Sequence, residues 1–196
     1  MKKEPFTRDL YIVSDSVGVL IKAVEDGASI IQLRDKKSDE DEIIRKAHEI
    51  LAYKKVKPFL FILNDNPELA KKTGADGVHI GQDMSTREAR TIAGPEMIVG
   101  KTTHSLEQAM LAVREGADYV SVGPVFATPT KPGRPAVGLP YVREAAAHLD
   151  IPFVAIGGID LTNIDEVLEA GAKTVGVVRA YGEAGELLKR IRGGEK

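Results

Sequence analysis

Three long polar side chains, Gln32, Arg34 and Lys36, alternate along one short segment of the chain. In an extended strand every second side chain points to the same face, so these three would point the same way. One explanation is that these side chains lie at a strand end exposed to solvent. Unpaired cations are costly to bury, however, so three long polar side chains on an inward face are hard to explain by packing alone. Lys131 adds a cation on a loop bounded by proline and glycine. Together these residues describe a pocket for a polyanion such as a phosphate or a diphosphate.

Two aspartates, Asp65 and Asp83, are the carboxylates best placed to hold a metal ion. They follow two neighbouring apolar segments of the chain. Hard oxygen ligands near a cationic pocket suit Mg²⁺ that bridges a diphosphate. Helix capping is the alternative for Asp65, because Asn66 and Pro67 directly after it look like the start of a helix.

A second anion site is expected where Gly157 and Gly158 follow a late apolar segment and Val178 and Arg179 follow the next. Glycine lets the backbone come close to a phosphate, and free N–H groups at a helix start bind anions. Two glycines alone are a weak signal. Their place after the seventh of eight apolar segments strengthens it, because barrel enzymes commonly bind phosphate there.

Acid–base groups are few. His79 and His104 are the candidates, and His79 lies inside an apolar segment, which favours a hydrogen-bonded structural histidine. We find no Ser-His-Asp set and no carboxylate pair suited to glycoside chemistry.

The elements that must position these residues are short apolar segments that alternate with amphipathic stretches. The apolar segments are residues 10–13, 30–33, 59–63, 78–80, 98–99, 119–125, 153–156 and 175–178. Segments that are rich in β-branched residues and apolar on both faces are typical of buried parallel strands. Residues 42–53 and 106–114 repeat apolar side chains at helical spacing. Eight strands, each followed by a helix, form either a closed barrel or an open doubly wound sheet.

A repeated Gly-Ala pair favours the barrel. Gly27, Gly74, Gly116 and Gly171 each precede an alanine and lie just before the second, fourth, sixth and eighth apolar segments. A glycine there supplies the left-handed residue that ends a helix, and its fourfold recurrence indicates approximate internal symmetry. We therefore predict an α/β fold, a single compact (β/α)8 TIM barrel over residues 1–196. Its site should lie at the C-terminal ends of the strands.

The composition excludes several classes of function. The chain has 27 basic and 29 acidic residues, a net charge of −2 and no cysteine. This balance gives no reason to expect a nucleic-acid or membrane partner, and disulfides and thiolate sites are excluded. There is no signal-like apolar start and no apolar run of membrane-spanning length. We expect a cytoplasmic protein, with a homo-oligomer left open.

Segments along nearly the whole chain resemble the signature segments of the thiamine-phosphate synthase family. They are residues 32–36, 64–65, 77–83, 118–126, 128–131 and 155–159. The Gln-x-Arg-x-Lys segment and the Thr-x-Thr-Lys loop are the most specific. The resemblance implies an enzyme that joins 4-amino-2-methyl-5-(diphosphooxymethyl)pyrimidine to a thiazole phosphate, giving thiamine phosphate and diphosphate.

The resemblance also implies roles for individual residues. The pyrimidine diphosphate would be held by Gln32, Arg34, Lys36, Asn64 and Lys131, with Thr102 where the family has a serine. Mg²⁺ would be bound by Asp65 and Asp83, and the thiazole phosphate by Thr128, Thr130, Gly158 and the backbone of Val178 and Arg179. The cations Arg34, Lys36 and Lys131 would act catalytically by stabilising the departing diphosphate. Such a reaction needs no strong general base.

Two departures from the family pattern leave alternatives open. Asp83 follows Gln82 directly, with Met84 at the position where the family has its aspartate, and Arg179 replaces a small serine. A diverged paralogue of the thiazole tautomerase branch is one alternative. That branch has a histidine at the position of Pro124 and lacks the Thr-x-Thr-Lys loop. A non-catalytic binder of a phosphorylated ligand is another, and a phosphosugar isomerase, which would need a glutamate base, is a third.

Overall fold

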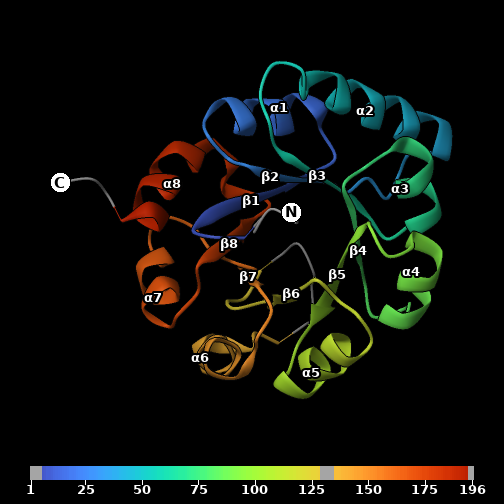
Figure 1. The fold of residues 1–196 in the computed structure, drawn as a ribbon. Coiled ribbons are helices and arrows are strands. Elements are labelled where there is room, and N and C mark those ends of the chain that lie inside the picture. The colour runs from blue at the N-terminus through green and yellow to red at the C-terminus, as the bar shows by residue number, and fades with distance from the viewer. Residues whose placement is uncertain (1–5, 129–134, 194–196) are drawn as a thin grey trace.

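The computed structural model describes residues 6–128 and 135–193. Within these ranges, parallel strands pair in chain order and close into an eight-stranded barrel, with the helices in a ring around it (Figure 1). The strands are β1 (Asp9–Ser14), β2 (Ile30–Leu33), β3 (Leu60–Asn64), β4 (Gly77–Ile80), β5 (Ile98–Thr103), β6 (Tyr119–Val122), β7 (Phe153–Ile156) and β8 (Thr174–Val177). This closure confirms the predicted (β/α)8 fold.

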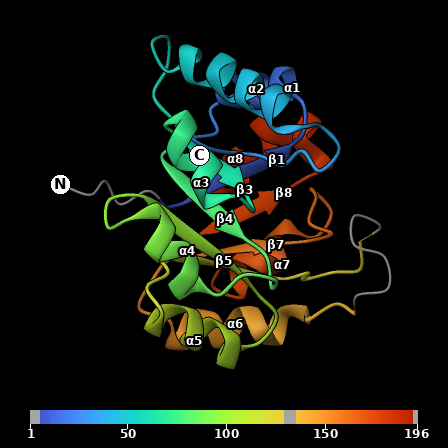
Figure 2. The same cartoon turned by 90° about the vertical axis from the view of Figure 1, so that its right-hand side faces the viewer.

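Helices follow the strands in the order that the sequence predicts. They are α1 (Val17–Glu25), α2 (Glu40–Tyr53), α3 (Pro67–Thr73), α4 (Thr86–Ala93), α5 (Leu106–Arg114), α6 (Gly138–His148), α7 (Ile164–Glu169) and α8 (Ala184–Arg192), with the short 3₁₀ helix η1 (Ala180–Glu183) before α8. The side view shows α1 and α2 on one side of the strands and α5 and α6 on the other (Figure 2). No helix of the described ranges is long and apolar enough to span a membrane.

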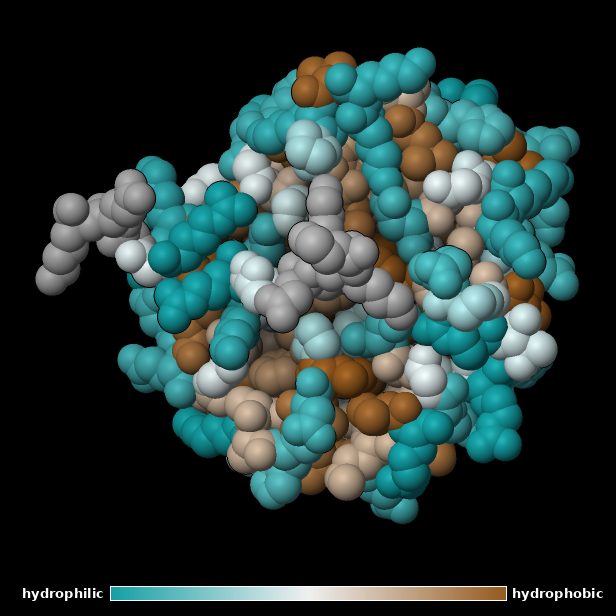
Figure 3. Space-filling model, viewed as in Figure 1, coloured by the Kyte–Doolittle hydropathy of each residue, from teal (hydrophilic) through white to brown (hydrophobic). Residues whose placement is uncertain are grey.

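Two apolar layers hold the barrel together. The larger one lies between the strands and the helices. The smaller one fills the barrel interior and includes Phe6, Tyr11, Ile30 and Tyr119. Phe6 stacks on Tyr119 with 4.5 Å between ring centroids. Figure 3 shows hydrophilic side chains over much of the rim of the face seen along the barrel axis, with apolar side chains exposed in its lower part, as is normal for a protein surface.

The repeated Gly-Ala pairs make the same turn at four places. The glycines have φ values of 106° at Gly27, 78° at Gly74, 95° at Gly116 and 103° at Gly171. The alanine after each donates its N–H to the carbonyl five residues earlier, as Ala28 does to Ala23. These turns bring the chain from the preceding helix into β2, β4, β6 and β8, which confirms the predicted role of the glycines.

Two strands end at other residues than the apolar runs that predict them. We predicted that the sixth strand reaches Val125, but β6 ends at Val122 because Pro124, in a cis peptide bond after Gly123, has no N–H to donate. The apolar run of the fifth strand covers only Ile98 and Val99, but β5 continues through the polar residues that follow to Thr103, whose backbone pairs with Val122. The hydroxyl of Thr103 donates to the carbonyl of Ser121 over 2.9 Å, so this polar residue is accommodated in the sheet.

Gly100 offers a test of the interior packing. A Cβ at this position would overlap the ring of Tyr119, which is fully buried. We expect Gly100→Ala to lower the free energy of unfolding by about 1–3 kcal/mol, the usual effect of overpacking a core. Urea denaturation measures this directly. Gly185→Ala in α8 is the control, because a Cβ there meets nothing within 4 Å. Equal stability of the two variants would show that the Tyr119 ring does not pack against Gly100.

Candidate active site

A cavity of about 770 Å³ opens at the C-terminal ends of the strands. It is lined by every predicted site residue that lies in the described ranges: Gln32, Arg34, Lys36, Asn64, Asp65, Asp83, Thr102, Thr128, Gly158, Val178 and Arg179. These side chains and backbone segments come from seven different strand ends, because only the barrel mouth brings them together. The predicted residues Thr130 and Lys131 lie outside the described residues.

A chain of hydrogen bonds crosses the floor of the cavity. The amide Nε2 of Gln32 donates to the Tyr11 hydroxyl over 2.6 Å, and the Tyr11 and Tyr119 hydroxyls are 2.8 Å apart. His79 lies 2.9 Å from the Tyr119 hydroxyl through Nδ1 and 3.0 Å from the Thr102 hydroxyl through Nε2. His79 is therefore the hydrogen-bonded histidine that we predicted, although its side chain also lines the cavity.

The two floor tyrosines are neutral groups. Burial raises the pKa of Tyr11 and that of Tyr119 well above the ordinary value of a tyrosine, since a buried phenolate would be poorly solvated. The network thus holds Gln32 and Thr102 in fixed positions, and its two tyrosine hydroxyls carry no charge beneath the cavity. The sequence does not single out Tyr11 and Tyr119, because aromatic residues in apolar segments look like ordinary core residues.

The cations after β2 are in different situations. Lys36 Nζ lies 2.9 Å from the carboxylate of Asp65. Arg34 forms no ion pair with any residue of the described ranges, although its side chain is half-buried and lines the cavity. A guanidinium in this situation offers its N–H donors to an incoming anion.

Asp65 and Asp83 face the same point at the mouth. A Cβ on Gly81 would lie 2.6 Å from Oδ1 of Asp83 and 3.7 Å from Oδ1 of Asp65, so the absence of a side chain at Gly81 leaves room for both carboxylates. The capping alternative for Asp65 is wrong. Asn66 caps α3 by accepting from the N–H of Leu69 over 2.8 Å, while Asp65 takes a left-handed conformation with φ 65°.

This pair of carboxylates fits a divalent cation. Carboxylate oxygens are the hard ligands that Mg²⁺ prefers, and Mg²⁺ is commonly held by one or two carboxylates together with substrate phosphates and water. The described residues contain no cluster of three or more potential metal ligands. Any ion between Asp65 and Asp83 would therefore depend on oxygens from substrate or water, as a diphosphate-bound Mg²⁺ does.

The glycine pair after β7 has a packing role that the sequence did not reveal. A Cβ on Gly157 would lie 2.6 Å from Cα of Pro124, and one on Gly158 would lie 2.8 Å from the carbonyl oxygen of Ala127. The N–H of Phe126 donates to the carbonyl of Gly157 over 3.0 Å. The glycines thus let the loop after β6, which carries Thr128, lie directly against the loop after β7.

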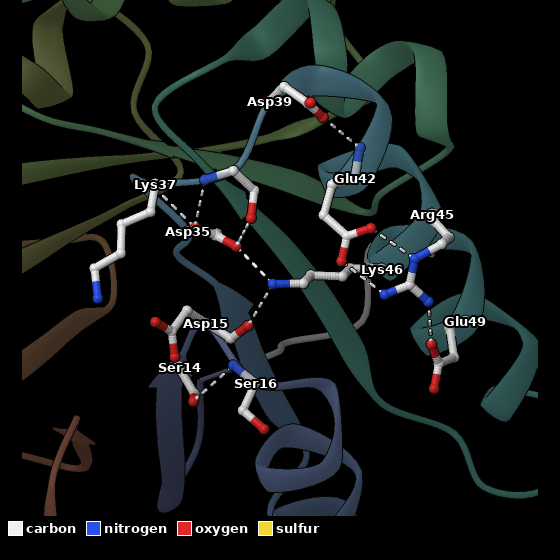
Figure 4. Close-up of polar contacts among 11 residues, drawn as sticks. Ser14, Asp15, Ser16, Asp35, Lys37, Asp39, Glu42, Arg45, Lys46 and Glu49 are labelled. Carbon is white, nitrogen blue, oxygen red and sulfur yellow. Dashed lines mark hydrogen bonds and ion pairs between the residues drawn. The ribbon is translucent and has the colours of Figure 1, made fainter.

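A buried aspartate fixes the loop that carries Arg34 and Lys36 (Figure 4). Asp35 accepts from Nζ of Lys46 over 2.6 Å and from the hydroxyl of Ser38 over 2.7 Å. The same Lys46 ammonium donates to the backbone carbonyl of Asp15 after β1 over 3.2 Å. The sequence pattern alone gives Asp35 no role of its own, so this role is a finding of the structure.

We expect Asp35→Asn to destabilise the protein in a pH-dependent way. The hydrogen bond from the Lys46 ammonium holds the pKa of Asp35 well below its usual value. A carboxylate with a lowered folded pKa stabilises the fold above its unfolded pKa of about 3.9, and this stabilisation is lost as the pH falls through the folded pKa. The stability gap between wild type and variant should therefore be full at neutral pH and shrink below about pH 4.

Urea denaturation at several pH values measures this gap. Asp150→Asn is the matched control, because Asp150 is exposed and its substitution should leave the unfolding midpoint unchanged. An Asp35→Asn variant that is as stable as wild type at pH 7 would refute the role of the Lys46–Asp35 pair.

Comparison with known proteins decides which family carries this site. The family described as thiamine monophosphate synthase matches residues 7–181 of the chain. The chain belongs to the thiamine monophosphate synthase family. The match covers all eight strands and every predicted site residue, so the family assignment and the cavity concern the same part of the molecule.

Similar proteins agree with this family. The thiamine-phosphate synthase of Thermus thermophilus is 51% identical over 83% of the chain and 79% of the relative. That of Thermosynechococcus vestitus is 43% identical over 95% of the chain, and the chain spans 56% of its length. The thiamine phosphate pyrophosphorylase of Pyrococcus furiosus has a TM-score of 0.84 at 33% identity, covering 93% of this chain and 94% of that one.

Proposed function

We propose that the chain is a transferase that joins 4-amino-2-methyl-5-(diphosphooxymethyl)pyrimidine to a thiazole phosphate, giving thiamine phosphate and diphosphate. The observation that carries this proposal is the cavity. A cationic segment, a pair of carboxylates and a glycine-rich phosphate-type loop, each expected from a different part of the sequence, line one space at the barrel mouth. The family and its thiamine-phosphate synthase members support the same reaction.

In the proposed reaction, the diphosphate lies on the side of β2, β3 and β4. Arg34, Lys36 and Asn64 bind its oxygens there, and Lys131 is assigned to the same group by the sequence resemblance. Asp65 and Asp83 hold Mg²⁺, which when bound neutralises part of the diphosphate charge. Breaking the C–O bond leaves both bonding electrons on the diphosphate and yields a pyrimidinylmethyl cation. Arg34 and Lys36 stabilise the negative charge as it grows on the leaving group.

The second half of the reaction forms the C–N bond. Gln32 donates its amide N–H to Tyr11, so its amide oxygen is the atom that would accept a hydrogen bond from the pyrimidine amino group. Thr102 lies at the other end of the same chain of hydrogen bonds and also lines the cavity. Thr128, Thr130, Gly158 and the backbone at Val178 and Arg179 hold the thiazole phosphate, which presents the thiazole nitrogen to the cation. Rate enhancement here comes from orientation and charge stabilisation, without a general base.

The test is to incubate the purified chain with both substrates, with Mg²⁺ or with a chelator, and to separate the products by chromatography. The proposal predicts equal amounts of thiamine phosphate and diphosphate with Mg²⁺ and neither with the chelator. Isomerisation of the thiazole without C–N bond formation would replace the proposal with the tautomerase alternative. Binding of the thiazole phosphate with no conversion would replace it with the non-catalytic binder. We also propose that the protein is cytoplasmic, because such phosphorylated substrates occur in the cytoplasm.

A further inference from the structure

Lys101 is a partly buried lysine that the proposed reaction does not use. It lies on β5 between Gly100, whose Cα faces the Tyr119 ring in the barrel interior, and Thr102, which lines the cavity. Because side chains alternate along a strand, Lys101 points away from the interior, toward the loop between β4 and α4. Its side chain does not line the cavity.

The ammonium of Lys101 closes this loop at both ends. Nζ donates to the carbonyl of Gly81 and to the carbonyl of Met84, each over 2.6 Å. These two carbonyls bracket the segment that contains Asp83. Gln82, inside the same segment, donates its side-chain amide to the carbonyl of Thr102. Two consecutive residues of β5 therefore fix the segment against the barrel.

We propose that Lys101 is a positioning residue that holds Asp83 opposite Asp65 at the Mg²⁺ site. This inference rests on the proposed function, since that function supplies the reason for an ion there. Asp83 lies on a short loop, and its carboxylate reaches the point near Gly81 only while that loop keeps its shape. Without the ammonium, the two carbonyls lose a shared charged donor, and the loop has to be ordered again when an ion binds. That ordering weakens ion affinity.

The chain supplies a matched control for this contact. Lys57, after α2, also donates to two backbone carbonyls, those of Val24 at 2.6 Å and Glu25 at 3.2 Å. These carbonyls lie at the end of α1, and Lys57 does not line the cavity. Lys57→Met thus removes the same kind of contact far from Asp65 and Asp83, which separates loss of stability from loss of ion positioning.

The first measurement is the affinity for Mn²⁺ in the presence of inorganic diphosphate, followed by electron paramagnetic resonance, which needs no turnover. Lys101→Met should weaken Mn²⁺ binding by about 10–100-fold, the usual effect of removing a group that orients a metal ligand. Lys101→Arg should restore most of the affinity, and Lys57→Met should bind Mn²⁺ like wild type. Equal affinity in Lys101→Met and wild type, or equal weakening in Lys57→Met, would overturn the proposal.

A double-mutant cycle then asks whether Lys101 acts through Asp83. In an Asp83→Asn background, Lys101→Met should cause little further loss of Mn²⁺ affinity, because the group that it positions is already changed. Full additivity would overturn the proposal. If Lys101→Met does not fold, as judged by circular dichroism, Lys101→Gln takes its place with the same two readouts.

Product formation separates this inference from the proposed function. In the active wild type, Lys101→Met should raise the Mg²⁺ concentration needed for half-maximal rate while changing kcat much less. A wild type that forms no thiamine phosphate, combined with Mn²⁺ binding that depends on Lys101, would refute the function and leave the positioning role supported. An active wild type whose Mg²⁺ dependence is unchanged in Lys101→Met would refute the positioning role alone.

Discussion

Replacing Arg34 with alanine is expected to lower kcat/KM for the pyrimidine diphosphate by about 10²–10³-fold, the range seen when one donor to a developing negative charge is removed. The guanidinium lines the cavity and has no ion-pair partner in the described ranges. The variant should therefore lose a contact to substrate without losing one that holds the fold. Steady-state kinetics with varied pyrimidine diphosphate measures the effect, and the unfolding midpoint should stay close to that of wild type.

Lys37→Ala is the control for Arg34→Ala. Lys37 is an exposed cation of the same loop that does not line the cavity, so its removal should leave kcat/KM nearly unchanged. If both variants lose activity to the same extent, a general loss of positive charge would explain the result, and the specific role of Arg34 would be wrong.

Asp83→Asn is the second substitution with a large expected effect. It keeps the size of the side chain but removes one of the two negative charges that face Gly81, and Mg²⁺ binds carboxylates far better than amides of the same shape. At limiting Mg²⁺ we expect the rate to fall by about 100-fold or more. Loss of a group that only orients a metal ligand lowers metal affinity or activity by about 10–100-fold, and loss of a ligand itself should cost at least as much. Raising the Mg²⁺ concentration should recover part of the rate.

The comparison for Asp83→Asn is Asp15→Asn. Asp15 is an exposed aspartate at the end of β1 that does not line the cavity, and its substitution should leave the Mg²⁺ dependence as it is in wild type. A rate profile over Mg²⁺ that is the same in Asp83→Asn and wild type would show that Asp83 is not a ligand.

The structure clarifies the departure at residues 83 and 84 that the sequence left open. The carboxylate of Asp83 faces the Gly81 Cα next to Asp65. Met84, at the position where the family has its aspartate, packs against the apolar layer between strands and helices. The geometry therefore leaves Asp83 as the carboxylate opposite Asp65, and its role as a ligand stays a prediction.

The fold could be predicted because its determinants are local and repeated. Buried parallel strands are apolar on both faces, and the Gly-Ala turns mark every second strand with a conformation that favours glycine. The ends of β5 and β6 could not be predicted in this way. Thr103 stays in the sheet because its hydroxyl finds the Ser121 carbonyl, and such a partner comes from tertiary packing, which no local pattern records.

The candidate site was predictable to the extent that its residues follow strands, since a barrel gathers all its strand ends at one mouth. Residues whose side chains bind backbone carbonyls could not be predicted. Lys101 binds two carbonyls, and every residue has a carbonyl, so no sequence pattern identifies its partners. Asp35 could not be predicted, for a different reason: its partner Lys46 lies 11 positions away on a helix face and looks like an ordinary solvated lysine.

The most direct test of the account is a crystal structure of the chain with Mn²⁺ and diphosphate, in which anomalous scattering locates the ion. The account predicts one Mn²⁺ peak between the carboxylates of Asp65 and Asp83, with the diphosphate extending from it toward Arg34. An ion elsewhere in the molecule, or a diphosphate bound at the Gly158 side of the cavity without Mn²⁺, would contradict it.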